Sequence, residues 1–116
     1  LTLEWPTSAA LPPTGLPGVG ALLTVVRAQF DEGLIAKVLE PGTTYERVLV
    51  GGQPGVWLAG QPHMVMYRTE SGEAVPETLR LAGNTLIWTV GPFTYRLESA
   101  LDRDAAIAVA SSLGTA

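Results

Sequence analysis

Two short runs joined by a turn decide the fold: Thr85–Val90 (TLIWTV) and Phe93–Glu98 (FTYRLE), separated by Gly91-Pro92. Both runs are rich in β-branched and aromatic residues, as strands are, and Gly-Pro is a turn signal. The stretch therefore predicts two antiparallel strands. Large apolar residues stand at every second position: Leu86, Trp88, Val90, Phe93, Tyr95 and Leu97. Since alternate side chains of a strand share one face, we expect these two sets to pack across the strands.

Similar runs precede this pair at roughly ten-residue spacing. Strands are predicted at 1–5, 21–28, 45–50, 56–59, 63–69 and 78–81. The run 21–28 (ALLTVVRA) is almost continuously apolar, which is typical of a central strand covered on both faces. Gly51-Gly52 predicts a tight hairpin turn. Together these runs predict a mainly antiparallel sheet, a meander of about seven or eight short strands.

Two helices are expected beside the sheet, which makes the fold class α+β. The first covers 31–40, with Asp31 as its cap, and ends at Pro41-Gly42. The second follows a cap at Ser99 or Asp102. Its predicted apolar face consists of Ala106, Ile107, Ala110 and Leu113. The two alanines of this face are small enough for the C-terminal helix to pack closely on the sheet.

The length and composition indicate one domain covering residues 1–116. The chain has 116 residues, 47% of them hydrophobic, which is enough for an ordinary globular core. The stretch 6–20 contains four prolines and three glycines and predicts a long exposed loop. The chain begins at Leu1 without a signal pattern, and we interpret it as the excised C-terminal domain of a longer protein.

The charge pattern argues against several classes of partner. The chain has seven Lys and Arg residues and eleven Asp and Glu residues, which gives a net charge of −4, and the basic residues are scattered along the sequence. No basic cluster is present that would neutralise a run of phosphates or hold an anionic lipid surface. No apolar run reaches ~18 residues, so we expect no direct membrane insertion by this fragment. Nothing marks one strand as a dimer interface.

The sequence offers no set of residues suited to catalysis or metal binding. Cysteine is absent, and His63 is the sole histidine, with no acidic residue within four positions. A zinc site needs three or four ligands, and a nucleophilic serine needs a base, so we predict no catalytic residue, metal or cofactor. His63 is open to two interpretations, a turn histidine bonded to backbone or a pH-sensitive ligand contact.

Trp57, His63 and Trp88 are the candidates for contact with a ligand. Aromatic side chains are over-represented at binding surfaces, so the two tryptophans could line a shallow apolar pocket between sheet and helix. The alternative is that both tryptophans simply fill the core across neighbouring strands.

Four runs together resemble a bacterial domain family of uncharacterised function. They are 52–63 (GQPGVWLAGQPH), which fits a G-x-x-G-x-W-x-x-G-x-P-H pattern, then 80–88 (RLAGNTLIW), 94–98 (TYRLE) and 105–113 (AAIAVASSL). The resemblance extends over nearly the whole chain from about Leu16. In that family the domain often forms the outer, C-terminal end of a membrane-anchored protein that has a cytoplasmic zinc-finger anti-sigma module.

The resemblance implies a non-enzymatic extracytoplasmic sensor or regulatory domain. Its partner would be a protein or an envelope ligand, and a transmembrane helix outside this fragment would tether it to the cell surface. The resemblance brings no catalytic residues with it.

Two other functions remain open on the residues alone. One is a free-standing domain that binds a small molecule or a lipid, suggested by the low charged fraction, 16%, and the aromatic set. The other is a hydrolase that uses His63 as its base, for which no second catalytic group is evident.

Overall fold

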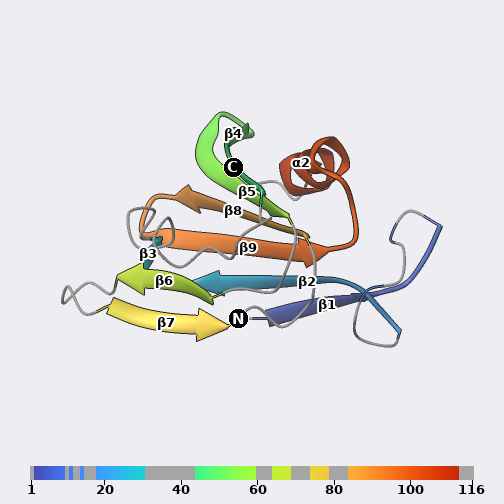
Figure 1. The fold of residues 1–116 in the computed structure, drawn as a ribbon, viewed down its shortest axis with the longest axis horizontal. Helices are drawn as coiled ribbons and strands as arrows, with labels where there is room; N and C mark the ends of the chain where they lie inside the picture. Colours follow the sequence, from blue (N-terminus) through green and yellow to red (C-terminus); the bar gives the residue numbers. More distant parts are fainter. Residues whose placement is uncertain are drawn as a thin grey trace.

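The computed structural model describes residues 2–9, 11, 14, 18–30, 44–59, 64–68, 74–78 and 84–112. The described strands form two sheets in which every pairing is antiparallel (Figure 1). The large sheet has six strands, in the spatial order β1 (Thr2–Pro6), β2 (Val19–Val26), β9 (Phe93–Ser99), β8 (Asn84–Val90), β5 (Gln53–Ala59) and β4 (Thr44–Val50). The small sheet has three strands, in the order β3 (Gln29–Phe30), β6 (Met64–Arg68) and β7 (Ala74–Thr78).

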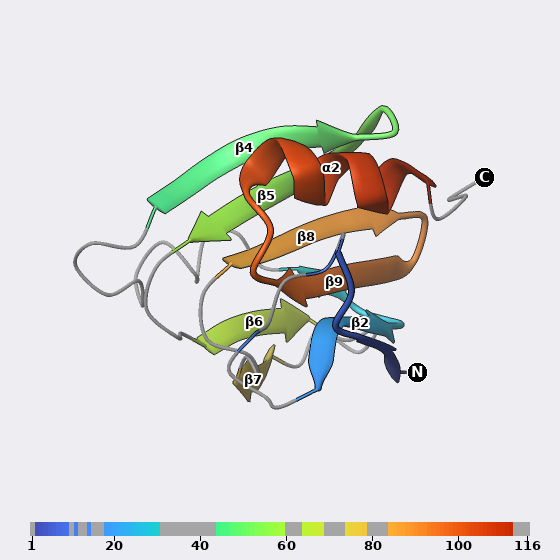
Figure 2. The same ribbon diagram turned by 90° about the vertical axis from the view of Figure 1, so that its right-hand side faces the viewer.

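One helix, α2 (Arg103–Ser112), lies in the described part of the chain, next to β4, β8 and β9 (Figure 2). A mainly antiparallel sheet with this helix packed on it confirms the α+β class. The predicted first helix, 31–40, lies outside the described residues. No helix in the described ranges has both the length and the apolar character needed to cross a membrane.

The β8–β9 pair forms as the large apolar residues at every second position predict. Leu86 stands opposite Leu97, Trp88 opposite Tyr95 and Val90 opposite Phe93. The rings of Trp88 and Tyr95 stack with their centroids 5.3 Å apart and their planes 19° from parallel. Cross-strand packing of the two apolar sets is therefore confirmed.

The β4–β5 hairpin and the central position of β2 also agree with the sequence. Gly51 and Gly52 connect β4 to β5 with φ angles of 56° and 83°, the left-handed conformation that a two-residue turn of this kind requires. Strand β2 lies between β1 and β9. Four consecutive β2 residues, Ala21 to Thr24, are buried, so both faces of this strand are covered.

The strand number and order differ from the prediction. The described residues form nine strands rather than seven or eight, and these strands do not form one meander. Strand β2 pairs with β9 from the far end of the chain, and β6 and β7 leave the large sheet to pair with each other. The two-residue β3 is too short to show a period. A strand not predicted from the sequence covers 74–78 and contains Pro76, which an edge strand tolerates, whereas residues 79–81 of the predicted strand 78–81 lie outside the described residues.

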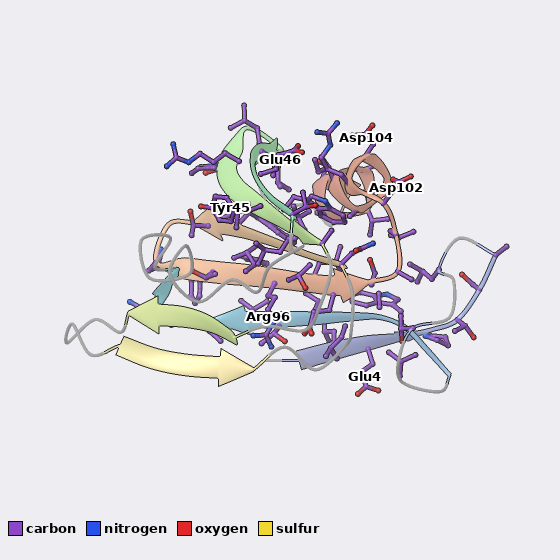
Figure 3. All side chains as sticks on the ribbon, in the orientation of Figure 1. Glu4, Tyr45, Glu46, Arg96, Asp102 and Asp104 are labelled. Carbon is purple, nitrogen blue, oxygen red and sulfur yellow. The ribbon has the colours of Figure 1, made fainter. Side chains whose placement is uncertain are left out.

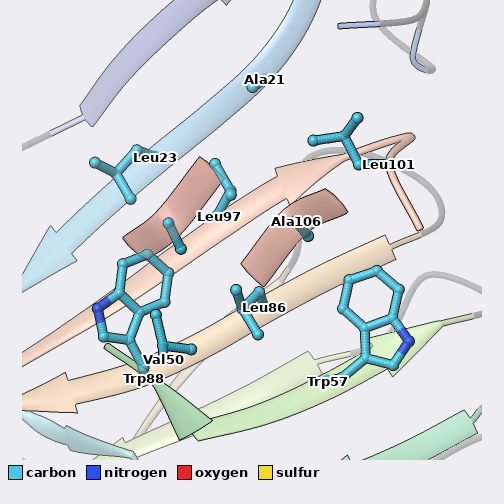
Figure 4. Packing of buried hydrophobic residues seen from close by; sticks show 10 residues of the cluster. Ala21, Leu23, Val50, Trp57, Leu86, Trp88, Leu97, Leu101 and Ala106 are labelled. Atoms are coloured by element: carbon cyan, nitrogen blue, oxygen red, sulfur yellow. The ribbon is translucent and has the colours of Figure 1, made fainter. Parts of the chain in front are cut away.

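The larger apolar core lies between the large sheet and α2 (Figure 4). Its buried members come from one face of the sheet, from the facing side of the helix and, in the case of Leu101, from the segment before the helix: Ala21, Leu23, Val50, Trp57, Leu86, Trp88, Leu97, Leu101, Ala106 and Ala110. Ala106 and Ala110 are 1% and 0% exposed, which confirms close packing of α2 through small residues. Leu113, the fourth member of the predicted helix face, lies outside the described residues.

The opposite face of the large sheet carries a smaller apolar cluster of Ala28, Val56, Leu58 and Ile87. Both ends of the predicted 6–20 loop are instead part of the large sheet, because Pro6 belongs to β1 and Val19-Gly20 belong to β2. The connection between these strands is therefore shorter than the sequence predicted.

Candidate functional site

Trp57 and Trp88 both lie in the core beneath α2. Trp57 is 5% exposed and Trp88 is fully buried. Across the β5–β8 pair, Trp57 stands opposite Leu86, and Trp88 stands opposite Gly55. The two indoles are thus offset along the strands, with Leu86 between them (Figure 4). The structure places them on one face but does not bring them together into a pocket wall, and His63 lies outside the described residues.

A cavity of about 210 Å³ opens at the edge of the helix–sheet interface. Its described lining comes from four elements and one loop: Trp5 of β1, Leu11, Ala21 of β2, Leu97 of β9, and Val109 and Ser112 of α2. Five of these six side chains are apolar. The cavity therefore offers an apolar surface between the start of the chain and the end of its helix.

The strand register explains why space remains there. Trp5 pairs with Ala21, and Ala21 pairs with Ser99, so the small Ala21 side chain stands between two larger neighbours across β1, β2 and β9. Ala21 is 1% exposed but reaches only one carbon above the sheet. The half-buried Trp5 forms one wall, and α2 lies across the space that Ala21 leaves.

Leu11 reaches the cavity because its turn is held by hydrogen bonds. The backbone N–H of Ser8 donates to the Leu11 carbonyl at 3.0 Å, and the Leu11 N–H donates back to the Ser8 carbonyl at 3.2 Å. The Leu11 N–H also lies 3.1 Å from the Ser8 hydroxyl oxygen. The Thr14 hydroxyl donates to the Val19 carbonyl at 2.6 Å, which ties the same connection to β2. The connection that the sequence marks only as an exposed loop thus supplies a wall of the cavity.

The charged side chains of α2 lie at its first turn, and its last described turn carries none. At its start, the Asp102 carboxylate accepts a hydrogen bond from the Ala105 N–H at 2.8 Å, and Arg103 pairs with Glu46 of β4 and with Asp104. Hydrogen bonding to Glu46, and then to Asp104, raises the pKa of Arg103 above its ordinary value. Figure 3 shows this acidic group at the α2–β4 end of the molecule.

At its last described turn, α2 presents Val109 and Ser112 to the cavity. The Ser112 hydroxyl donates to the Val109 carbonyl at 2.7 Å. The described lining contains no charged side chain.

The other face of the large sheet holds a buried ion pair. Arg96, labelled in Figure 3, lies with its guanidinium 3.2 Å from the Glu98 carboxylate, and both side chains are fully buried. Arg96 also reaches the Thr24 hydroxyl at 3.5 Å, and the Thr94 hydroxyl donates to the Ala28 carbonyl at 2.5 Å. Because no solvent reaches the pair, a substrate cannot meet either group, and we assign the pair a structural role.

Sequence reasoning missed every residue of the cavity. The sequence marks Trp5 and Ala21 only as strand residues, and their position beside Leu97 in the cavity wall depends on the pairing of β2 with β9 from the far end of the chain. Among the described residues, no group of three or more His, Asp or Glu side chains lies close enough together to hold a metal ion. Compared with known proteins, the chain matches no protein-family model, no curated protein and no solved structure.

Proposed function

We propose that this chain is the extracytoplasmic sensor or regulatory domain of a membrane-anchored, anti-sigma-factor-like protein, and that it acts by binding a protein or ligand rather than by catalysis. The family resemblance of runs 52–63, 80–88, 94–98 and 105–113 supports the location and the regulatory role. The apolar cavity between Trp5 and Val109 is the observation that carries the binding role.

A ligand in this cavity would contact segments from both ends of the chain. Trp5 and Leu11 come from the first strand and its connection, whereas Val109 and Ser112 come from the last helix. Anything that binds only the closed arrangement of these segments stabilises it by mass action. Such binding supplies a physical means of biasing an attached module, because it changes how firmly the two ends of the domain are held together.

The location is tested by labelling a single cysteine, since the native fragment has none. Ala108→Cys in the full-length protein places a thiol on the exposed side of α2, and Ala110→Cys places one in the buried helix–sheet interface. In intact cells, a membrane-impermeant maleimide should label the thiol at position 108 of this domain and leave the thiol at position 110 largely unlabelled.

Labelling of the 108 variant only after the cells are broken would contradict the extracytoplasmic location. A full-length sequence without an apolar segment of about 20 residues before residue 1 would contradict the tether. The control is the same reaction in lysate. There the exposed 108 thiol should react and the buried 110 thiol should not, which shows that both variants retain the fold.

A free-standing small-molecule or lipid-binding domain is the second candidate, and the same cavity favours it. Sites for drug-sized ligands usually span about 300–1,000 Å³. At about 210 Å³, this cavity fits a smaller molecule or one apolar part of a larger one. The labelling result separates the two candidates, since only the sensor domain requires a location outside the cytoplasm.

A further inference from the structure

The cavity lined by Trp5, Ala21 and Val109 has features that select among ligands by charge as well as by size. We propose that it binds a small amphiphile with an apolar body of about six carbons and a neutral or positively charged head group, and that it discriminates against carboxylates of the same length. This inference rests on the binding role proposed above and names the ligand class for that site.

The size of the apolar body follows from the cavity. A protein cavity of about 150 Å³ lined by aliphatic and aromatic side chains stays dry and binds benzene, which has six carbons. The present cavity is somewhat larger, about 210 Å³, and is open to solvent at one side. Its walls at Leu11, Leu97 and Val109 offer no hydrogen-bonding side chain, so a six-carbon body is held by burial of apolar surface.

The charge preference follows from the helix end that borders the cavity. The carbonyl groups of the last turn of a helix carry about half a negative charge, which attracts cations and repels anions. The connection 7–18 and the residues 113–116, which adjoin the lining residues in sequence, contain no Lys or Arg that could offset this field. Arg103 lies at the other end of α2, where it is engaged by Glu46 and Asp104.

Trp5 adds a second reason for a preference for cations. Its indole is half-buried at the cavity wall, and an aromatic face attracts a nearby ammonium group. The neighbouring Glu4 is exposed and, by strand alternation, stands on the opposite face of β1 (Figure 3). The preference therefore arises from the indole and the helix end rather than from an ion pair.

Three probes of equal length and different charge test this inference: n-hexylamine, n-hexanol and n-hexanoate, titrated by calorimetry at pH 7 and low salt. We expect the amine and the alcohol to bind, and the carboxylate to bind about two- to five-fold more weakly than the alcohol, the range expected of a helix terminus. Equal affinity for all three probes, or tighter binding of hexanoate, would overturn the charge preference.

Two substitutions fill the cavity from different sides. Val109→Phe fills it from the helix, and Ala108→Phe places the same side chain on the exposed face of α2 as the matched control. Ala21→Leu fills the cavity from β2. We expect each filling substitution to weaken hexanol binding at least ten-fold while the control binds normally. Native binding by a folded filling variant would show that the probe binds elsewhere.

A substitution at one exposed position tests the electrostatic effect of the helix end by adding a positive charge beside the cavity. Ser112→Lys adds a positive charge at the lining and should make hexanoate bind at least as tightly as hexanol, whereas Ala108→Lys should leave the native order unchanged. No detectable binding of any probe to the native protein would overturn this inference. The cysteine-labelling result would then still decide the proposed location and tether independently.

Discussion

Gly55 is the residue that makes room for the most deeply buried aromatic side chain. It stands opposite Trp88 across the β5–β8 pair, and a Cβ at this position would lie 2.6 Å from the Ile87 carbonyl oxygen and 3.0 Å from the Trp88 Cβ. The first of these contacts is with backbone, which cannot rotate away. A glycine is therefore required here by the close approach of two strands.

Gly55→Ala should lower the free energy of unfolding by about 1–3 kcal/mol, the usual cost of overpacking a well-packed core. Chemical denaturation monitored by tryptophan fluorescence measures the change. Gln53→Ala, in a half-buried position of the same strand, is the control and should change stability much less. Equal stability of Gly55→Ala and the native protein would show that β5 and β8 are farther apart than described.

The Arg96–Glu98 pair is a second feature of single residues, on the opposite face of the sheet. Both side chains are fully buried and 3.2 Å apart. Removing one partner of such a pair deprives the remaining buried charge of this ion-pair contact, which typically costs about 3–5 kcal/mol. Replacing both partners with apolar side chains removes this cost.

Arg96→Met alone should therefore destabilise the protein by about 3–5 kcal/mol, and the double variant Arg96→Met/Glu98→Leu should be more stable than the single one. A double-mutant cycle based on urea unfolding provides the measurement. Strictly additive effects of Arg96→Met and Glu98→Leu would contradict an interaction between the two side chains.

At the scale of elements, α2 depends on its first turn and on its small buried residues. The Asp102 carboxylate accepts the Ala105 N–H at 2.8 Å, the hydrogen bond expected of a helix cap. The Asn84 amide donates to the Leu101 carbonyl at 2.7 Å, which attaches the residue before the cap to β8. The start of α2 is thus fixed by both local and long-range contacts.

Asp102→Ala should cost about 0.5–2 kcal/mol of stability because the Ala105 N–H loses its acceptor. Asp102→Asn retains an acceptor oxygen and should cost clearly less. Thermal unfolding followed by circular dichroism compares the two variants. A loss in the asparagine variant as large as that in the alanine variant would show that charge, rather than the hydrogen bond, is what matters.

Ala110→Leu should destabilise the protein by about 1–3 kcal/mol, since Ala110 is fully buried where α2 meets the sheet. Ala108→Leu adds the same atoms on the exposed side of α2 and should be nearly neutral. Denaturant midpoints of the two variants give the comparison. If the two substitutions had the same effect, α2 would not pack on the sheet in this orientation.

The elements that the sequence predicts well are those with strong local patterns. The 85–98 hairpin, the Gly51-Gly52 turn and the Asp102-capped helix each depend on residues close together in the chain. The strand order was not predictable in this way, because β2 pairs with β9 some seventy positions later. The cavity was missed for the same reason, since its walls at Trp5, Leu97 and Val109 meet only once that pairing has formed.

At the scale of the whole molecule, the first strand and the strand that leads into the last helix lie on either side of β2 in one sheet. Strand β1 pairs with β2, β2 pairs with β9, and the chain then continues from β9 into α2. This arrangement leaves the cavity between the first strand and the last helix, apart from the core position of Trp57 and Trp88. The proposed recognition role depends on that location.

The indole N–H signals of the three tryptophans give the most direct test of this account. Proton–nitrogen correlation spectra are recorded while n-hexanol is added, with the Trp5 signal assigned through Trp5→Phe. We predict that the Trp5 signal shifts in a saturable way while the signals of Trp57 and Trp88 stay nearly still. A larger shift at Trp57 or Trp88, or no shift at Trp5, would contradict binding in the cavity.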